Sequence, residues 1–185
     1  MTLDILAATE IQDERLSSLA TLWQSAFLKI GKPPSFESLH ASIAADIEPL
    51  IWLVEERGTP RRFCYLSSGE HVRIAYGGSI VGRYLDEIVM RSALPRVHGY
   101  FDIALARPAI VHIAGRIYAE ADRPADGERL LLPIADARTG RVNRLLGATM
   151  HSWVAPNSPT GMVSTRQVRT FIPLDGSPPW SETGF

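Results

Sequence analysis

The sequence predicts a single α+β domain: a five-stranded antiparallel sheet with helices on one face and a helical extension at the N-terminus. Apolar residues recur every three to four positions in residues 9–30, which is helical spacing. Early in residues 109–154 they alternate with polar residues, which is strand spacing. A length of 185 residues suits one compact core. With 45% hydrophobic and 21% charged residues, the composition is that of a globular protein.

Three consecutive segments are expected. Residues 1–48 form an N-terminal helical extension, residues 49–154 form the core, and residues 155–185 form a C-terminal extension rich in Pro, Ser and Thr. The last segment has the composition of a mobile end, with one strand expected within residues 162–172. The division therefore places all five strands of the sheet in the middle segment.

Two helical stretches are expected in the N-terminal extension. In residues 9–30 one helical face carries an apolar stripe, and Thr9 with Gln12 could form the capping box that starts the helix. Prolines then end this helix, and a second amphipathic stretch covers residues 36–50. The stripe of the first helix consists of Leu16, Leu19, Ala20, Trp23, Phe27 and Ile30.

The first part of the core reads as a hairpin followed by helices. Residues 49–56 and 62–66 are apolar or aromatic runs separated by turn residues, which predicts two paired strands. A short helix is expected after Gly82, and Pro95 is well placed to start a longer one that Pro108 closes. No strand is expected between the hairpin and Pro108.

The second part of the core reads as a three-stranded meander. β-favouring runs start near residue 109, cover residues 130–134 and continue through residues 142–153. Asp126-Gly127 and Arg138-Thr-Gly140 are expected to supply the two hairpin turns between them.

Local motifs in this core resemble those of a known family. The segments are Arg62-Phe-Cys-Tyr-Leu66, Ala75-Tyr-Gly77, Ile80-Val-Gly-Arg-Tyr-Leu-Asp86, Leu130-Leu-Leu-Pro-Ile134 and Gly140-Arg-Val-Asn-Arg-Leu-Leu-Gly147. Together with the order of the elements, they resemble a PAS-like domain family of alphaproteobacteria. The resemblance implies a PAS fold and a sensory or regulatory domain, commonly dimeric, without catalytic residues of its own.

A ligand cavity is expected between the core helices and the sheet. Its candidate lining residues are Tyr84, Ile88, Tyr100, Phe101, Val111 and Ile113. A filled core is the alternative, because any helix packed on a sheet needs such a pattern.

Cofactors and metals are not expected. The five histidines and one cysteine form no HxxxH, CxxC or HExxH motif. His98 falls on the edge of its helix's apolar arc, which does not suit a haem ligand, and Cys64 lies on an expected strand rather than in a flavin-binding helical segment. The carboxylates of Asp86, Glu87 and Asp102 are expected on solvated helix faces, so no acid–base pair is expected either.

The expected partners are a second copy of the chain, an unknown signalling protein and a small molecule. A net charge of -1 with scattered arginines does not suit nucleic acid, and no apolar run reaches membrane-spanning length, so a cytoplasmic protein is expected. Leu16, Leu19, Trp23 and Phe27 are expected to cover the outer sheet face and to contribute to a homodimer.

Three functions remain open on the sequence. The favoured one is a PAS-like sensory or regulatory domain that binds a small ligand or a protein partner and signals through protein contacts. A pure docking or dimerisation module with no ligand is the alternative, and a small enzyme of unfamiliar type is a remote one. The chain is expected not to be an enzyme, because the predicted core faces are almost wholly apolar.

Overall fold

The computed structural model describes residues 4–118, 124–155 and 166–184, which form an α+β fold around one seven-stranded sheet. The strand order is β2-β1-β5-β4-β3-β6-β7, and every neighbouring pair is antiparallel. The strands are β1 (Ile51–Arg57), β2 (Arg62–Ser68), β3 (Ala109–Tyr118), β4 (Ala125–Ala135), β5 (Val142–Trp153), β6 (Gln167–Pro173) and β7 (Trp180–Gly184).

The prediction of five strands is wrong, because the C-terminal segment extends the sheet. β6 pairs with the free edge of β3, and β7 pairs with β6. Phe171 and Ile172 of β6 are buried on opposite faces, so this segment contributes to the core on both sides. The expected mobile end is also corrected over Trp180–Gly184, which form a strand, while residues 156–165 lie outside the described part.

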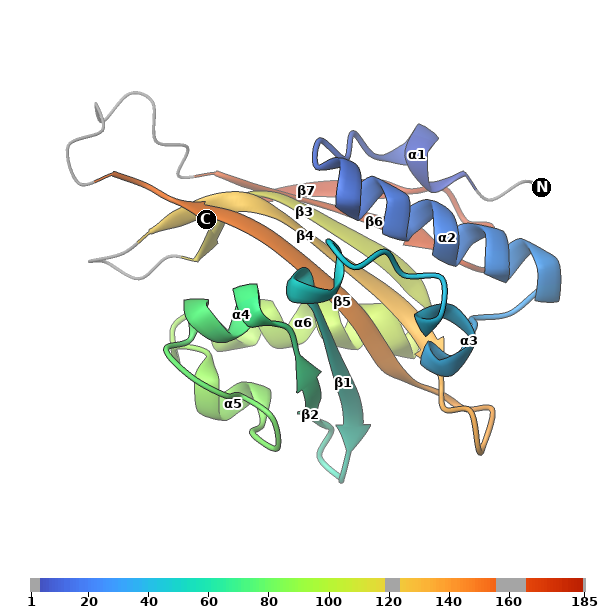
Figure 1. Ribbon diagram of the computed structural model, residues 1–185, viewed down its shortest axis with the longest axis horizontal. Coiled ribbons are helices and arrows are strands. Elements are labelled where there is room, and N and C mark those ends of the chain that lie inside the picture. Colours follow the sequence, from blue (N-terminus) through green and yellow to red (C-terminus); the bar gives the residue numbers. More distant parts are fainter. Residues whose placement is uncertain (1–3, 119–123, 156–165, 185) are drawn as a thin grey trace.

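Helices cover both faces of the sheet (Figure 1). The N-terminal ones are α1 (Ile5–Ala8), α2 (Glu14–Ile30), α3 (Phe36–His40) and the 3-10 turn η1 (Glu48–Leu50). The ones between β2 and β3 are α4 (Glu70–Ala75), α5 (Leu85–Ile88) and α6 (Leu94–Ala106). Residues 69–107 are all described and none belongs to a strand, as predicted.

Each face of the sheet has its own core. The outer core joins the α2 stripe to even-numbered residues of β4 such as Leu130 and Leu132. The inner core joins α6 to odd-numbered residues of the central strands such as Val111 and Leu131. The alternation of side chains along a strand therefore separates the two cores by a single backbone layer.

Helix α2 covers the outer face, as its apolar stripe predicts. Leu16, Leu19 and Trp23 are fully buried within one chain, and the Trp23 indole donates a hydrogen bond to the Pro133 carbonyl at 2.9 Å. These three residues have no exposed surface with which to meet a second copy.

The start of α2 differs from the expected one. Asp13, not Thr9, is the N-cap, and its carboxylate accepts from the Arg15 and Leu16 amides. Thr9 instead caps the end of the short helix α1. The second amphipathic stretch is likewise shorter than expected, since α3 ends at His40 and only the η1 turn follows before β1.

The expected hairpin turn at Asp126-Gly127 is wrong, whereas the one at residues 138–140 is confirmed. Asp126 pairs with Arg116 and Gly127 pairs with Gly115 inside the β3–β4 ladder. Glycine is required at position 127 by close packing, since a Cβ there would lie 2.1 Å from the Met150 carbonyl oxygen. β4 therefore starts five residues earlier than expected and includes Glu128 and Arg129.

Candidate functional site

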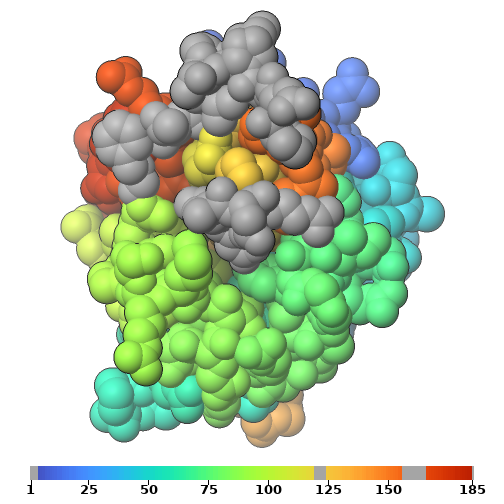
Figure 2. All heavy atoms as spheres, turned by 90° about the vertical axis from the view of Figure 1, so that its left-hand side faces the viewer, coloured from blue at the N-terminus to red at the C-terminus, as the bar shows by residue number. Residues whose placement is uncertain are grey.

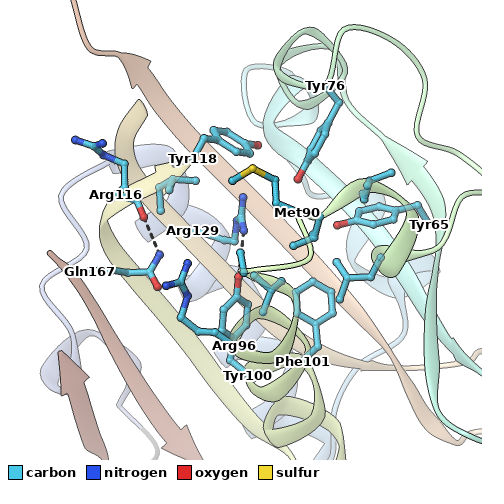
Figure 3. Close-up of a pocket in the computed structure, with 16 residues that line it drawn as sticks. Tyr65, Tyr76, Met90, Arg96, Tyr100, Phe101, Arg116, Tyr118, Arg129 and Gln167 are labelled. Carbon is cyan, nitrogen blue, oxygen red and sulfur yellow. Dashed lines mark hydrogen bonds between the residues drawn. The ribbon is translucent and has the colours of Figure 1, made fainter. Parts of the chain in front are cut away.

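A cavity of about 70 Å³ lies between the inner sheet face and the helices α5 and α6. Figure 2 views the end of the molecule where the green helical segments meet the yellow and orange ends of the central strands. Figure 3 shows the side chains that line the cavity, which come from β2–β4, α5, α6, β6, the residue that follows α4 and the segment between α5 and α6. Elements distant in sequence thus converge on one small space.

Arg129 of β4 is the charged group at the centre of this cavity. Odd-numbered residues of β4 face inward, and β4 lies between β3 and β5, so the Arg129 side chain is covered by strands and helices. The residue is 8% exposed. A guanidinium does not lose its proton in proteins, so a positive charge is held in the interior.

The described residues use only part of the hydrogen-bonding capacity of the Arg129 guanidinium. Its Nε donates to Thr149 Oγ1 at 3.1 Å, and its Nη1 lies 3.4 Å from the Tyr100 hydroxyl, which is a long hydrogen bond. Thr149 is its cross-strand partner on β5 and also accepts from the Trp52 indole. Within the described ranges no carboxylate forms an ion pair with Arg129, although burying a charge normally requires one.

Four of the five tyrosines of the sequence line the cavity around Arg129 (Figure 3). Its Cζ lies 5.4 Å from the ring centroid of Tyr118, which is within cation–π range. Burial raises the pKa of the Tyr65, Tyr76 and Tyr118 phenols, so they remain neutral hydroxyl groups at physiological pH. The ring faces and hydroxyl dipoles of the four tyrosines moderate the charge without cancelling it.

Three further polar atoms at the cavity are buried without a hydrogen-bond partner in the described chain. They are Tyr118 OH, Gln167 Oε1 and Arg96 Nε. Gln167 is held in place through its other amide atom, which donates to the Arg116 carbonyl at 2.7 Å. Buried polar atoms are rarely left unpaired in a folded protein, so this grouping marks a place where polar atoms of another molecule can bind.

The charge of the lining is positive. Arg96 of α6 and Arg129 of β4 both extend into the cavity region, whereas the Arg116 side chain points away from it (Figure 3). Arg116 pairs instead with Asp126 at 2.6 Å. None of the lining residues within 4–118, 124–155 and 166–184 is an aspartate or a glutamate.

The remaining wall is apolar, formed by Leu85, Ile88, Val89, Met90, Ala93, Val97, Phe101 and Ile117. Met90 is 45% exposed and marks the side where the cavity approaches the surface. The site therefore pairs a cationic, hydroxyl-lined half with an apolar half.

The residues expected to bind a ligand divide into two groups. Ile88, Tyr100 and Phe101 line the cavity. Val111 and Ile113 are fully buried in the inner core and are not among the lining residues. Tyr84 faces elsewhere, since the Arg62 guanidinium stacks 3.8 Å above its ring.

Sequence reasoning missed Arg129, Tyr118 and Gln167. The expected turn at Asp126-Gly127 started the next strand only at Leu130, which left Arg129 outside it. The available signal was the two-residue period itself, because Arg129 shares the parity of Leu131 rather than that of Leu130 and Leu132.

The other candidate groups make ordinary contacts. His98 uses both ring nitrogens, one 3.0 Å from Asp102 and one 3.1 Å from the Arg61 carbonyl. Asp86 pairs with Arg62 on the surface, and Cys64 is buried and free. The described residues contain no cluster of three potential metal ligands and no helix long and apolar enough to cross a membrane.

Comparison of the chain with protein-family models, with curated proteins and with solved structures finds no match.

Proposed function

We propose that the chain is a PAS-like sensory or regulatory domain that binds a small molecule in the Arg129 cavity and signals through protein contacts. The observation that carries the proposal is the cavity itself. A buried guanidinium shares it with three other buried polar atoms, and in the described part of the chain the guanidinium has no carboxylate partner and the three atoms have no hydrogen bond of standard geometry. A filled inner core would instead have favoured a docking module without a ligand.

The arrangement of β1 to β5 supports the PAS-like part of the proposal. Two strands are followed by α4, α5 and α6 and then by three antiparallel strands, and these three helices cover one face of the sheet. That is the element order that the sequence resemblance implies. β6, β7 and α2 are additions to it.

The composition of the cavity supports binding rather than catalysis. A general base or nucleophile would need a carboxylate, histidine, cysteine, serine or lysine, and the lining residues that the structure describes include none of these. The tyrosines are unsuitable as bases, since burial raises the pKa of three of them.

Thermal unfolding with a panel of small metabolites tests the proposal. The panel holds neutral, cationic and anionic compounds, and the proteins are the wild type, Ala93→Leu and Ala106→Leu. Ala93 lines the cavity, whereas Ala106 is exposed at the end of the same helix, so the second variant controls for added bulk. Ligands raise Tm because they bind only the folded state.

The expected result is that at least one compound raises the Tm of the wild type and of Ala106→Leu but not that of Ala93→Leu. If no compound stabilises the wild type, or if Ala93→Leu responds equally, the cavity is not a ligand site and the docking function is favoured instead.

Dimerisation stays a prediction. Leu16, Leu19 and Trp23 are buried in one chain, so a dimer would use other residues, such as the exposed Leu28 and Ile30 at the end of α2. Light scattering of the intact chain checks the oligomeric state.

A further inference from the structure

We infer that the ligand of the Arg129 cavity is a small organic anion, a monocarboxylate of two to four carbons, whose carboxylate pairs with the Arg129 guanidinium. This inference rests on the proposed function, because it names the chemical class of the ligand that the cavity binds.

The charge of the cavity lining favours an anionic ligand. Arg129 is 8% exposed and has no carboxylate partner in the described part of the chain, and a second guanidinium, that of Arg96, lines the same space. A ligand that brings a negative charge offsets the cost of burying the Arg129 charge and is attracted by the partly exposed Arg96, whereas a cationic ligand is repelled by both. An anion is therefore strongly favoured.

The hydrogen-bonding geometry of the Arg129 guanidinium favours a carboxylate. Nε of Arg129 is bound to Thr149 and Nη1 has only the long contact with Tyr100. Among the described residues Nη2 makes no hydrogen bond within 3.5 Å, although the Tyr118 phenol lies beside the guanidinium and interacts with it. A planar carboxylate matches the fork of a guanidinium and accepts two hydrogen bonds from it. The Tyr118 hydroxyl makes no hydrogen bond of standard geometry, although it interacts with Arg129 and Tyr76, and it is a further neutral donor at the same cavity.

The volume of the cavity limits the length of the ligand. One water-sized site takes about 10–15 Å³, and the cavity measures about 70 Å³. The space therefore suits on the order of five non-hydrogen atoms by that measure, which corresponds to a carboxylate with a short chain. Ile88, Met90 and Phe101 supply an apolar wall for the chain, which an inorganic oxyanion such as phosphate would leave without a partner.

Isothermal titration calorimetry with propionate, propionamide and inorganic phosphate tests the inference. Propionamide has nearly the shape of propionate without its charge, and phosphate has the charge without an apolar part. A ligand of this size is limited to affinities no tighter than the order of 1 μM. Propionate is expected to bind at least about tenfold more tightly than either of the other compounds.

Three variants locate the binding. Arg129→Met removes the charge at similar length and is expected to weaken propionate binding about 30-fold or more. Arg129→Lys keeps the charge but loses the fork, so an intermediate loss is expected. Arg141→Gln is the matched control, because Arg141 is exposed next to the β4–β5 turn, and it should change the affinity less than twofold.

The outcomes separate this inference from the proposed function. Equal binding of propionate and propionamide, or propionate binding that Arg129→Met leaves unchanged, overturns the anion assignment while the cavity remains a ligand site. Phosphate binding as tight as that of propionate overturns the carboxylate assignment. If propionate does not bind while a neutral compound of the thermal panel does, only this inference fails; if nothing binds in either experiment, both fail.

Discussion

Glu128 and Arg129 are adjacent in β4, carry opposite charges and are both buried, but they differ in the hydrogen-bond partners that the chain gives them. The Glu128 carboxylate on the outer face accepts from the Gln12 and Asp13 amides at 2.7–3.0 Å and lies 2.9 Å from His112 Nε2. The Arg129 guanidinium on the inner face has two hydrogen bonds to described residues, one of them long.

The difference in partners indicates a structural role for the Glu128 charge and a binding role for the Arg129 charge. Glu128 fixes the start of α2 on the sheet and has its acceptor capacity filled by groups of the same chain. Arg129 keeps donor capacity that another molecule can use, next to a cavity. Burial alone does not distinguish the two residues, which are 7% and 8% exposed; their partners do.

The largest effect is expected on the Glu128 side. Glu128→Ala leaves the part-buried amides of Gln12 and Asp13 and the buried imidazole of His112 without their acceptor. An unpaired buried group costs about 1–3 kcal/mol, and the two amides, which water can reach in part, cost less than that. We expect a loss of about 3 kcal/mol or more in the free energy of unfolding, measured by urea denaturation. A loss below about 1 kcal/mol would show that Glu128 is as weakly integrated as Arg129.

A smaller effect, also on the Glu128 side, is expected from pH. Burial lowers the pKa of His112 below its usual 6.5, although the nearby Glu128 carboxylate opposes the shift. The unfolded chain then binds the proton more readily than the folded chain, so this contribution to stability is complete above pH 6.5 and is lost as the pH falls through the lowered pKa.

His112→Gln tests this sign because glutamine keeps a donor for Glu128 and does not titrate. Urea denaturation at pH 7.5 and pH 5.5 should show a smaller acid-induced loss for the variant than for the wild type. His40→Gln is the matched control, since His40 is exposed on α3. An equal loss in all three proteins contradicts the assignment to His112.

The smallest effect on stability is expected on the Arg129 side. Arg129→Met exchanges a buried, poorly paired charge for an apolar side chain of similar length, a change that is often neutral or stabilising. In buffer without carboxylates we expect the free energy of unfolding to change by less than about 1 kcal/mol or to rise. A loss as large as that of Glu128→Ala would make Arg129 a structural residue and remove the contrast.

The sequence predicts the elements whose pattern is local. The 62–66 strand, the helix that starts near Pro95 and the three-strand meander follow from spacing and turn residues, and each is present as β2, α6 and β3–β5. β6 and β7 were not placed in the sheet, because their pairing depends on the β3 edge, which only the assembled fold presents.

The candidate site was predictable to a similar extent. Ile88, Tyr100 and Phe101 lie on helices with a clear apolar face, which is why the spacing identified them. The local sequence did not identify Arg129 as a site residue, because a charged residue close to Asp126-Gly127 is typical of an exposed turn. Its burial comes from pairing on both sides with β3 and β5, which is a property of the sheet and not of the local sequence.

Binding of a small carboxylate to Arg129 can be observed at the residue itself by an NMR titration of the arginine Nε–Hε signals. Arg129→Lys assigns the signal of Arg129 by deleting it. Upon addition of propionate, a saturable shift is predicted for Arg129, with no shift for the exposed Arg141 and no response to propionamide. Saturable propionate binding that leaves the Arg129 signal unmoved, or no saturable shift at any concentration, would show that Arg129 does not bind the carboxylate.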